Sequence, residues 1–192
     1  MTKRSSIAKF GSMWSAFVVA VVAIAACFVA RDARAQSVAG WGRTGFSNID
    51  NISNNIVKVA AGYLHTVALK NDGTVACWGY NDSRQCNTPS NLGTVTAIAA
   101  GGYHTVALKN DGTVACWGNN NSGQCNTPAN LGPVTAIAAG RLHTVALKND
   151  GSVACWGNNG SGQCNTPSNL GPVTAISAGA EHTVALDRKS AV

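Results

Sequence analysis

Residues 104–142 read HTVALKNDGTVACWGNNNSGQCNTPANLGPVTAIAAGRL. The preceding stretch 65–103 differs from it at seven of 39 positions, and the following stretch 143–181 differs at six. The histidine that opens each copy recurs every 39 residues, at His65, His104, His143 and His182. Such similarity within one chain indicates recent duplication, and a fixed period of about 40 residues is typical of a repeat architecture.

One unit predicts three strands separated by turns. Residues 106–108 and 114–117 flank Lys-Asn-Asp-Gly at 109–112, which indicates a hairpin because Asn and Asp tolerate the turn and Gly supplies a positive φ. Residues 134–139 form a third strand of small side chains, which fit where strands crowd near the axis of a radial array. Residues 124–127 could form a fourth strand, and the sequence does not decide whether they do. Without helical periodicity, the unit predicts an all-β propeller blade.

The fold class that we expect is all-β, a propeller-type array of about four 39-residue blade equivalents after an N-terminal signal segment. Partial units flank the three complete ones, because residues 37–42 match the end of the hairpin and 182–186 form the last complete strand. An open arc, a four-bladed ring, a ring shared between chains and a truncated gene product all fit this count. Since unpaired strand edges promote association, we expect an open arc, or incomplete propeller, that forms a homo-oligomer, most simply a dimer.

Residues 1–35 have the pattern of a signal peptide. Three basic residues precede an apolar run at 14–30, and small residues follow at Ala33 and Ala35, where signal peptidase accepts little else. We expect cleavage after Ala35 and a repeat domain at 36–192. Two alternatives stay open, a lipid anchor on Cys27 and a membrane anchor formed by the apolar run. All three export the repeat domain to the periplasm, the cell surface or the medium.

Charge and composition exclude several functions. The chain has a formal charge of +6, but nine basic and seven acidic residues remain from Gln36 onward, too balanced for a nucleic-acid partner. The four histidines are spread one per unit, whereas metal ligands must lie within about 2 Å of one ion, so we expect a structural hydrogen bond from each. The aspartates of the hairpin turns (Asp72, Asp111 and Asp150) should accept local backbone bonds. No convergent catalytic set exists, so we expect no enzyme, cofactor, metal or small-molecule substrate.

Residues from about 38 to 186 resemble the repeat of the regulator-of-chromosome-condensation family, because each unit has the order A-A-G-x-x-H-T-x-A-L, D-G-x-V-x-x-W-G and G-Q. The variant G-Q-C-N-T-P resembles the bacterial exported branch of that family. The resemblance implies a propeller of about seven blades, with the histidine in the repeat frame. The family's nucleotide exchange on a small GTPase is not carried over, because the leader indicates export. Its plant photoreceptors sense light through Trp just before H-T, where this chain has none. The tryptophans before Gly should instead pack between blades: Trp41, Trp78, Trp117 and Trp156.

Six cysteines after the leader fall nine apart in each of three units. An even count in an exported chain predicts disulfides. The first partial unit has Gly40 at the first cysteine position and also lacks the second, so both cysteines are present or absent together. This favours three pairs within units, Cys77–Cys86, Cys116–Cys125 and Cys155–Cys164. The alternative is small buried thiols.

Differences between the copies concentrate in two loops, one before the histidine and one after Trp-Gly. Loops carry recognition, and Tyr and Arg are enriched in binding hot spots. In the resembling family the pre-histidine loop lies on a face used for protein contacts. The candidate contact face is therefore Tyr63, Leu64, Tyr103, Arg141, Leu142 and Glu181. Neutral drift at exposed positions explains the same variation.

The function predicted from these observations is an exported, non-enzymatic protein-binding module, with a protein partner that the sequence leaves unidentified. The alternatives are a structural, self-assembling repeat protein and a truncated propeller fragment with no independent activity.

Overall fold

The computed structural model describes residue 38 and residues 55–188, so the predicted signal segment lies outside the described residues. The described part is all-β, as predicted, and no helix in it is long and apolar enough to cross a membrane. Its strands are β1 (Ile56–Ala61), β2 (His65–Lys70), β3 (Val75–Gly79), β4 (Val95–Ala100), β5 (His104–Lys109), β6 (Val114–Gly118), β7 (Val134–Ala139), β8 (His143–Lys148), β9 (Val153–Gly157), β10 (Val173–Ala178) and β11 (Thr183–Asp187).

The strands form four antiparallel sheets with the orders β1-β2-β3, β4-β5-β6, β7-β8-β9 and β10-β11. Each sheet joins the last predicted strand of one sequence unit to the first strands of the next. The register repeats, with His104 opposite Gly118 in the second sheet and His143 opposite Gly157 in the third. No strand forms at 124–127, because local turn bonds occupy the backbone there. The Cys125 N–H, for example, donates to the Asn120 side chain at 2.8 Å.

The hairpin turn between β5 and β6 has the predicted chemistry. One Asp111 carboxylate oxygen accepts bonds from the Thr113 backbone N–H at 2.9 Å and from the Thr113 hydroxyl at 2.6 Å. Gly112 follows with φ of 79°, in the left-handed region that favours glycine. The same turn recurs at Asp72 and Asp150, so the aspartates have the local role expected of them.

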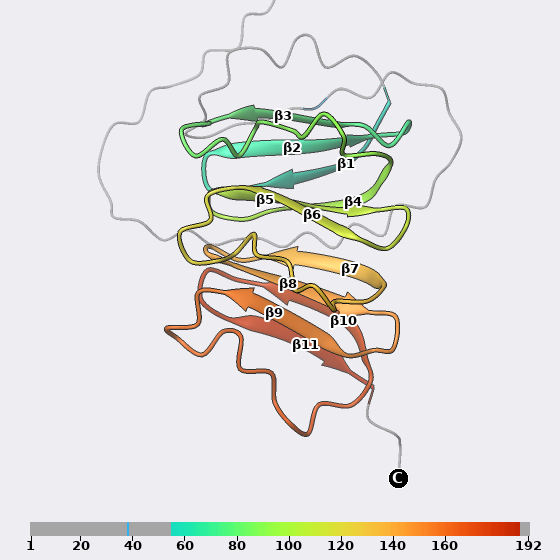
Figure 1. Cartoon of the computed structure of the whole chain (residues 1–192), viewed down its shortest axis with the longest axis vertical. Helices are drawn as coiled ribbons and strands as arrows, with labels where there is room; N and C mark the ends of the chain where they lie inside the picture. The colour runs from blue at the N-terminus through green and yellow to red at the C-terminus, as the bar shows by residue number, and fades with distance from the viewer. Residues whose placement is uncertain (1–37, 39–54, 189–192) are drawn as a thin grey trace, which may run out of the picture. The chain divides into compact units, whose positions relative to one another are not determined.

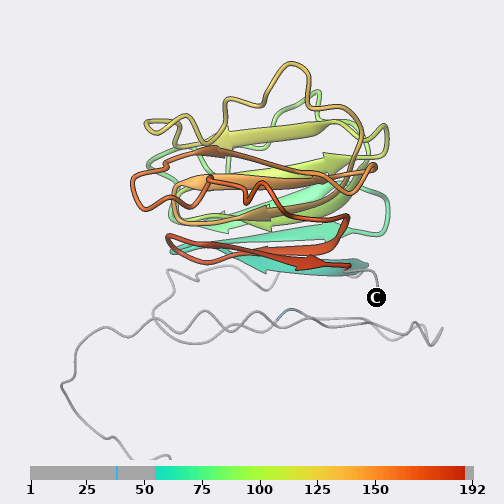
Figure 2. The ribbon, with the colours of Figure 1, turned by 90° about the horizontal axis from the view of Figure 1, so that it is seen from below.

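Successive sheets pack against one another through their first two strands. β2 contacts β4, β5 contacts β7 and β8 contacts β10, while the first strands of neighbouring sheets also touch. Figure 1 shows the resulting order of sheets, and Figure 2 shows the same strands from below. Within residues 55–188 the array does not close, because the sheet of β1–β3 and the sheet of β10–β11 lie at opposite ends of it.

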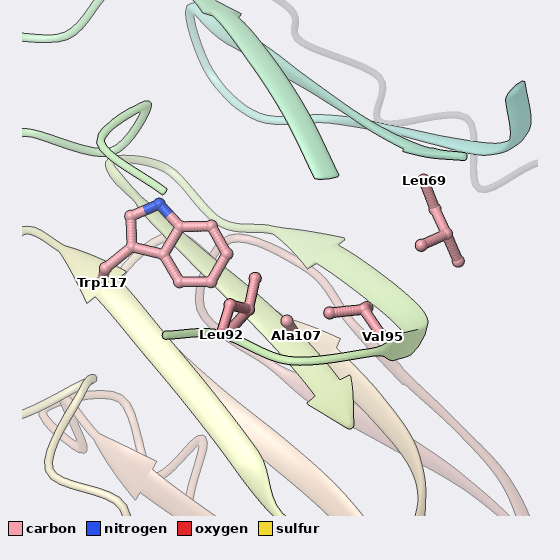
Figure 3. Packing of buried hydrophobic residues seen from close by; sticks show 5 residues of the cluster. All are labelled: Leu69, Leu92, Val95, Ala107 and Trp117. Carbon is pink, nitrogen blue, oxygen red and sulfur yellow. The ribbon is translucent and has the colours of Figure 1, made fainter. Parts of the chain in front are cut away.

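Tryptophan fills the space between sheets. Trp117 of β6 belongs to one buried cluster with Leu69 of the first sheet and with Leu92, Val95 and Ala107 (Figure 3). A matching cluster one unit later surrounds Trp156. Burying apolar area stabilises a fold by about 25 cal/mol per Å², so these clusters hold neighbouring blades together. Packing between blades is thus confirmed for Trp117 and Trp156, whereas Trp41 lies outside the described residues.

Candidate binding face and the bonds that build it

A buried three-residue bridge connects each blade to the next. The hydroxyl of Thr105 donates to the backbone carbonyl of Gln85 at 2.9 Å, and its oxygen lies 3.1 Å from Nε2 of His65. Because the hydroxyl has one hydrogen and the carbonyl can only accept, Nε2 of His65 must donate to the threonine. The bridge recurs as His104–Thr144–Gln124 and as His143–Thr183–Gln163.

The glycine three residues before each histidine makes room for this bridge. A Cβ at Gly62 would lie 2.5 Å from Nδ1 of His65 and 2.6 Å from the carbonyl oxygen of Gly101 in the next blade. Gly101 has the same relation to His104 and to Gly140. The glycine of the A-A-G motif is therefore required because the histidine ring and the backbone of the next blade leave no room for a Cβ.

Burial keeps the bridging histidines neutral. It lowers the pKa of His65 and of His104 to about 4, and it lowers the pKa of His143 as well. A neutral, buried, hydrogen-bonded imidazole is a structural group at pH 7, which agrees with the structural role predicted. Among the described residues no three His, Cys, Asp or Glu side chains gather as a metal site would require.

A buried glutamine organises the loop after each Trp-Gly. Oε1 of Gln124 accepts from the Ser122 backbone N–H at 2.9 Å, and its Nε2 donates to the Asn119 side chain at 2.8 Å. Gln163 repeats both bonds. Sequence reasoning noted the G-Q dipeptide but assigned no role to the glutamine. The glutamine is the same in all three copies although the loop around it varies, and this invariance could have indicated its role.

The structure gathers half of the predicted contact face. The rings of Tyr63 and Tyr103 lie 5.8 Å apart between centroids and are tilted by 57°. Tyr80 joins them from the loop after β3, with its centroid 6.3 Å from that of Tyr103 and a tilt of 65°. Tyr63 is 59% exposed, Tyr80 39% and the adjacent Leu64 38%. We call Tyr63, Tyr80 and Tyr103 the tyrosine cluster. Tyr80 was not among the predicted site residues, although it lies in a loop that varies between copies.

The other predicted residues lie further along the array, where the Gly102 N–H next to Tyr103 donates to the carbonyl of Arg141 at 3.1 Å. Arg141 and Glu181, both exposed, make an ion pair at 3.8 Å. The hydroxyl of Ser161 donates to Glu181 at 3.3 Å, while Leu142 is half-buried. Exposed ion pairs contribute little free energy. Arg141 and Glu181 therefore form a polar part of the predicted face, whereas its exposed aromatic side chains belong to the tyrosine cluster.

Two of the three predicted disulfides are present, Cys116–Cys125 and Cys155–Cys164, each with a Cα separation of 5.0 Å. Cys77 and Cys86 are unbonded but interact. Cys86 and burial raise the pKa of the Cys77 thiol, and the pKa of the Cys86 thiol is lowered by Cys77. The third disulfide stays a prediction.

Stacked antiparallel sheets with one repeated bridge between them define a β-propeller-type repeat protein. The family model described as the regulator of chromosome condensation (RCC1) repeat matches residues 56–85, 95–124 and 134–163. The chain is therefore an RCC1-repeat protein with three consecutive tandem copies, which confirms the resemblance to the repeat family, while the bacterial exported branch stays a prediction. Each match begins at the first strand of a sheet and ends at the buried glutamine.

Solved structures share this fold. The ectodomain of the receptor kinase CR4 from Physcomitrella patens has 26% sequence identity and a TM-score of 0.60, over 70% of this chain and 37% of that one. The ectodomain of the Arabidopsis thaliana receptor kinase ACR4 has 27% identity and a TM-score of 0.56, over 70% and 46%. Prp20p from Saccharomyces cerevisiae has 23% identity and a TM-score of 0.61, over 70% and 43%. This chain thus spans less than half the length of each. No curated protein sequence matches the chain.

Proposed function

We propose that this chain is an exported, non-enzymatic protein-binding module that contacts its partner through the pre-histidine loops. The exposed tyrosine cluster supports this proposal most strongly, because Tyr is enriched where binding energy concentrates. RCC1-type folds commonly mediate protein binding. The yeast structure Prp20p is described with its binding properties to Gsp1p and histones, and a protein partner is proposed here by analogy.

The loops that carry the cluster are held rigidly. The Gly62 N–H donates to the carbonyl of His65 at 2.9 Å, and the Tyr80 N–H donates to the carbonyl of Leu64 at 2.8 Å. Beneath them lies the buried bridge from His65 to Thr105. A surface that is ordered before binding loses less entropy when the complex forms, which favours recognition by these loops.

Export is supported by the leader and by the cysteine pairs. Disulfides persist in oxidising compartments and are rare in the cytosol, and two units carry one each. N-terminal sequencing of exported protein tests this directly. A first residue of Gln36 is expected, whereas a lipidated Cys27 or an intact Met1 contradicts cleavage after Ala35.

The test of binding compares loops at the two ends of the strands. The double variant Tyr63→Ser/Tyr103→Ser alters the proposed face, and Lys70→Ser/Lys148→Ser alters the hairpin turns at the other end of the strands as its control. Purified chains would be incubated with proteins from the cell exterior, and each protein retained would be purified and titrated by calorimetry. A partner that binds the control but not the tyrosine variant is expected. Equal binding by both variants contradicts the proposal.

Self-association is a second candidate, favoured by the edge of the last sheet. Within residues 55–188, β11 pairs only with β10, and Val184 and Leu186 are 54% and 63% exposed on it. Unpaired strands and exposed apolar side chains promote association. Light scattering after size exclusion should give the mass of a dimer, and Val184→Lys/Leu186→Lys should return the monomer. A monomer of the unaltered chain at high concentration contradicts this candidate.

A further inference from the structure

Each junction between neighbouring sheets is built from the same two faces. The middle strand of one sheet directs its histidine, valine and leucine at the next sheet, and in β5 these are His104, Val106 and Leu108, which are all buried. The next sheet contributes a threonine that bonds the histidine and a tryptophan that packs on the leucine, as Thr144 and Trp156 do. A sheet at the end of such an array therefore leaves one half of a junction open.

The last sheet carries the first half of a junction. On β11 and just before it, His182, Val184 and Leu186 hold the positions that are buried in the other units, and all three are exposed. His182 is held like the bridging histidines, because the Gly179 N–H donates to its carbonyl at 2.9 Å and a Cβ at Gly179 would lie 2.7 Å from its Nδ1. Within residues 55–188 no sheet follows β11, so no threonine of a next sheet is there to accept from this ring. We call His182, Val184 and Leu186 the last-sheet face.

The first sheet carries the second half. Thr66 and Trp78 hold the threonine and tryptophan positions of a junction, but both are only half-buried, whereas their counterparts in the second and third sheets are buried. Val59 of β1 is 57% exposed, although the isoleucines at the same position, Ile98 and Ile137, pack against the tryptophan clusters. We call Val59, Thr66 and Trp78 the first-sheet face. It offers an acceptor for the histidine and apolar groups for the leucine that the last-sheet face leaves open.

We propose that the first-sheet face of one copy of this chain docks on the last-sheet face of a second copy and repeats the junction between blades. Nε2 of His182 would donate to the hydroxyl of Thr66, and Leu186 would be covered by Trp78 and Val59. Within residues 55–188 the two faces lie at opposite ends of the array (Figure 1), which favours a second copy over the same chain as the occupant. Two copies that each present both faces can form a closed ring with two identical junctions. This inference rests on self-association, the second candidate function, and names the surface that each copy uses.

The test uses two variants that alter opposite faces. Val184→Lys/Leu186→Lys alters the last-sheet face, and Val59→Lys alters the first-sheet face. The matched control is Val57→Lys, because Val57 is exposed and its counterpart in the second sheet, Thr96, is exposed as well. Light scattering after size exclusion, over a dilution series, gives the dissociation constant of the dimer. Each face variant should raise this constant about a hundredfold, because an unpaired charge would be buried at the junction, and the control should leave it unchanged.

An equimolar mixture of the two face variants separates a contact between unlike faces from a contact between like faces. The mixed pair has one junction in which both faces are unaltered. The mixture should therefore give the mass of a dimer at a concentration where each variant alone is a monomer. Recovery of the dimer also shows that both variants are folded.

Three results would overturn this inference. If Val59→Lys stays a dimer while Val184→Lys/Leu186→Lys is a monomer, the last-sheet faces pair with each other, and self-association stands without a junction between unlike faces. A mixture that stays monomeric rejects the junction but leaves the dimer of the unaltered chain in place. A monomer of the unaltered chain rejects self-association together with the junction and indicates that the chain covers its own faces. None of these results bears on partner binding by the tyrosine cluster.

Discussion

Replacing Thr144 by valine tests the bridge that connects the blades. The hydroxyl of Thr144 accepts from His104 at 3.1 Å and donates to the carbonyl of Gln124 at 2.8 Å. All three residues are fully buried. Valine keeps the shape but removes the oxygen, so one donor and one acceptor lose their partners. Each such group costs about 1–3 kcal/mol, and we expect the free energy of unfolding to fall by about 4 kcal/mol.

Urea unfolding followed by tryptophan fluorescence measures this loss. The matched control is Thr135→Val, because Thr135 is exposed and donates only to the carbonyl of Leu147 at 3.2 Å. Its cost should stay under about 1 kcal/mol, as for surface substitutions. The reasoning about the bridge is wrong if Thr144→Val costs no more than Thr135→Val.

Three further predictions concern pH, packing and cysteine pairing. His104 has a pKa of about 4 when folded against about 6.5 when unfolded, so the unfolded chain binds the proton first as pH falls. The stability that depends on His104 should be complete above pH 6.5 and decline by up to about 3 kcal/mol towards pH 4, and the lowered pKa values of His65 and His143 add to the decline. Urea midpoints that do not change with pH refute this. Gly101→Ala places a Cβ 2.5 Å from Nδ1 of His104, and this overpacking should lower the free energy of unfolding by about 3 kcal/mol. The control Gly132→Ala has open space around the Cβ, so its loss of about 1 kcal/mol should come only from the positive φ of 72°. Equal thermal midpoints of the two variants would count against the steric argument. Non-reducing peptide mapping of exported protein should find Cys77 joined to Cys86, and two free thiols or a cross-unit pair would reject that disulfide.

The period and the hairpins could be predicted because their causes are local. Asp111 and Gly112 specify their turn within a few residues, and the spacing of Trp117 and Trp156 identifies one packing position in each unit. The bridge could not be predicted in the same way. His65 and Thr105 are 40 residues apart, and only the stacking of two sheets brings them together.

The tyrosine cluster was predicted in part for the same reason. The variable loops contain Tyr63 and Tyr103, whose role in binding stays a prediction, and the proximity of the two rings could not be inferred from a single unit. Tyr80 comes from a different loop and meets Tyr103 of the next blade, so its contribution depends on how blades stack. Arg141 and Glu181 pair with each other and do not extend the cluster.

The bridge between blades also has an evolutionary consequence. Each bridge uses a histidine and a glutamine from one blade and a threonine from the next, so every junction has the same chemistry. Unequal recombination between the near-identical copies would add or remove whole 39-residue units in register. Each remaining junction would again find its three partners. A lineage can therefore change the length of this array in single genetic steps without having to invent a new interface.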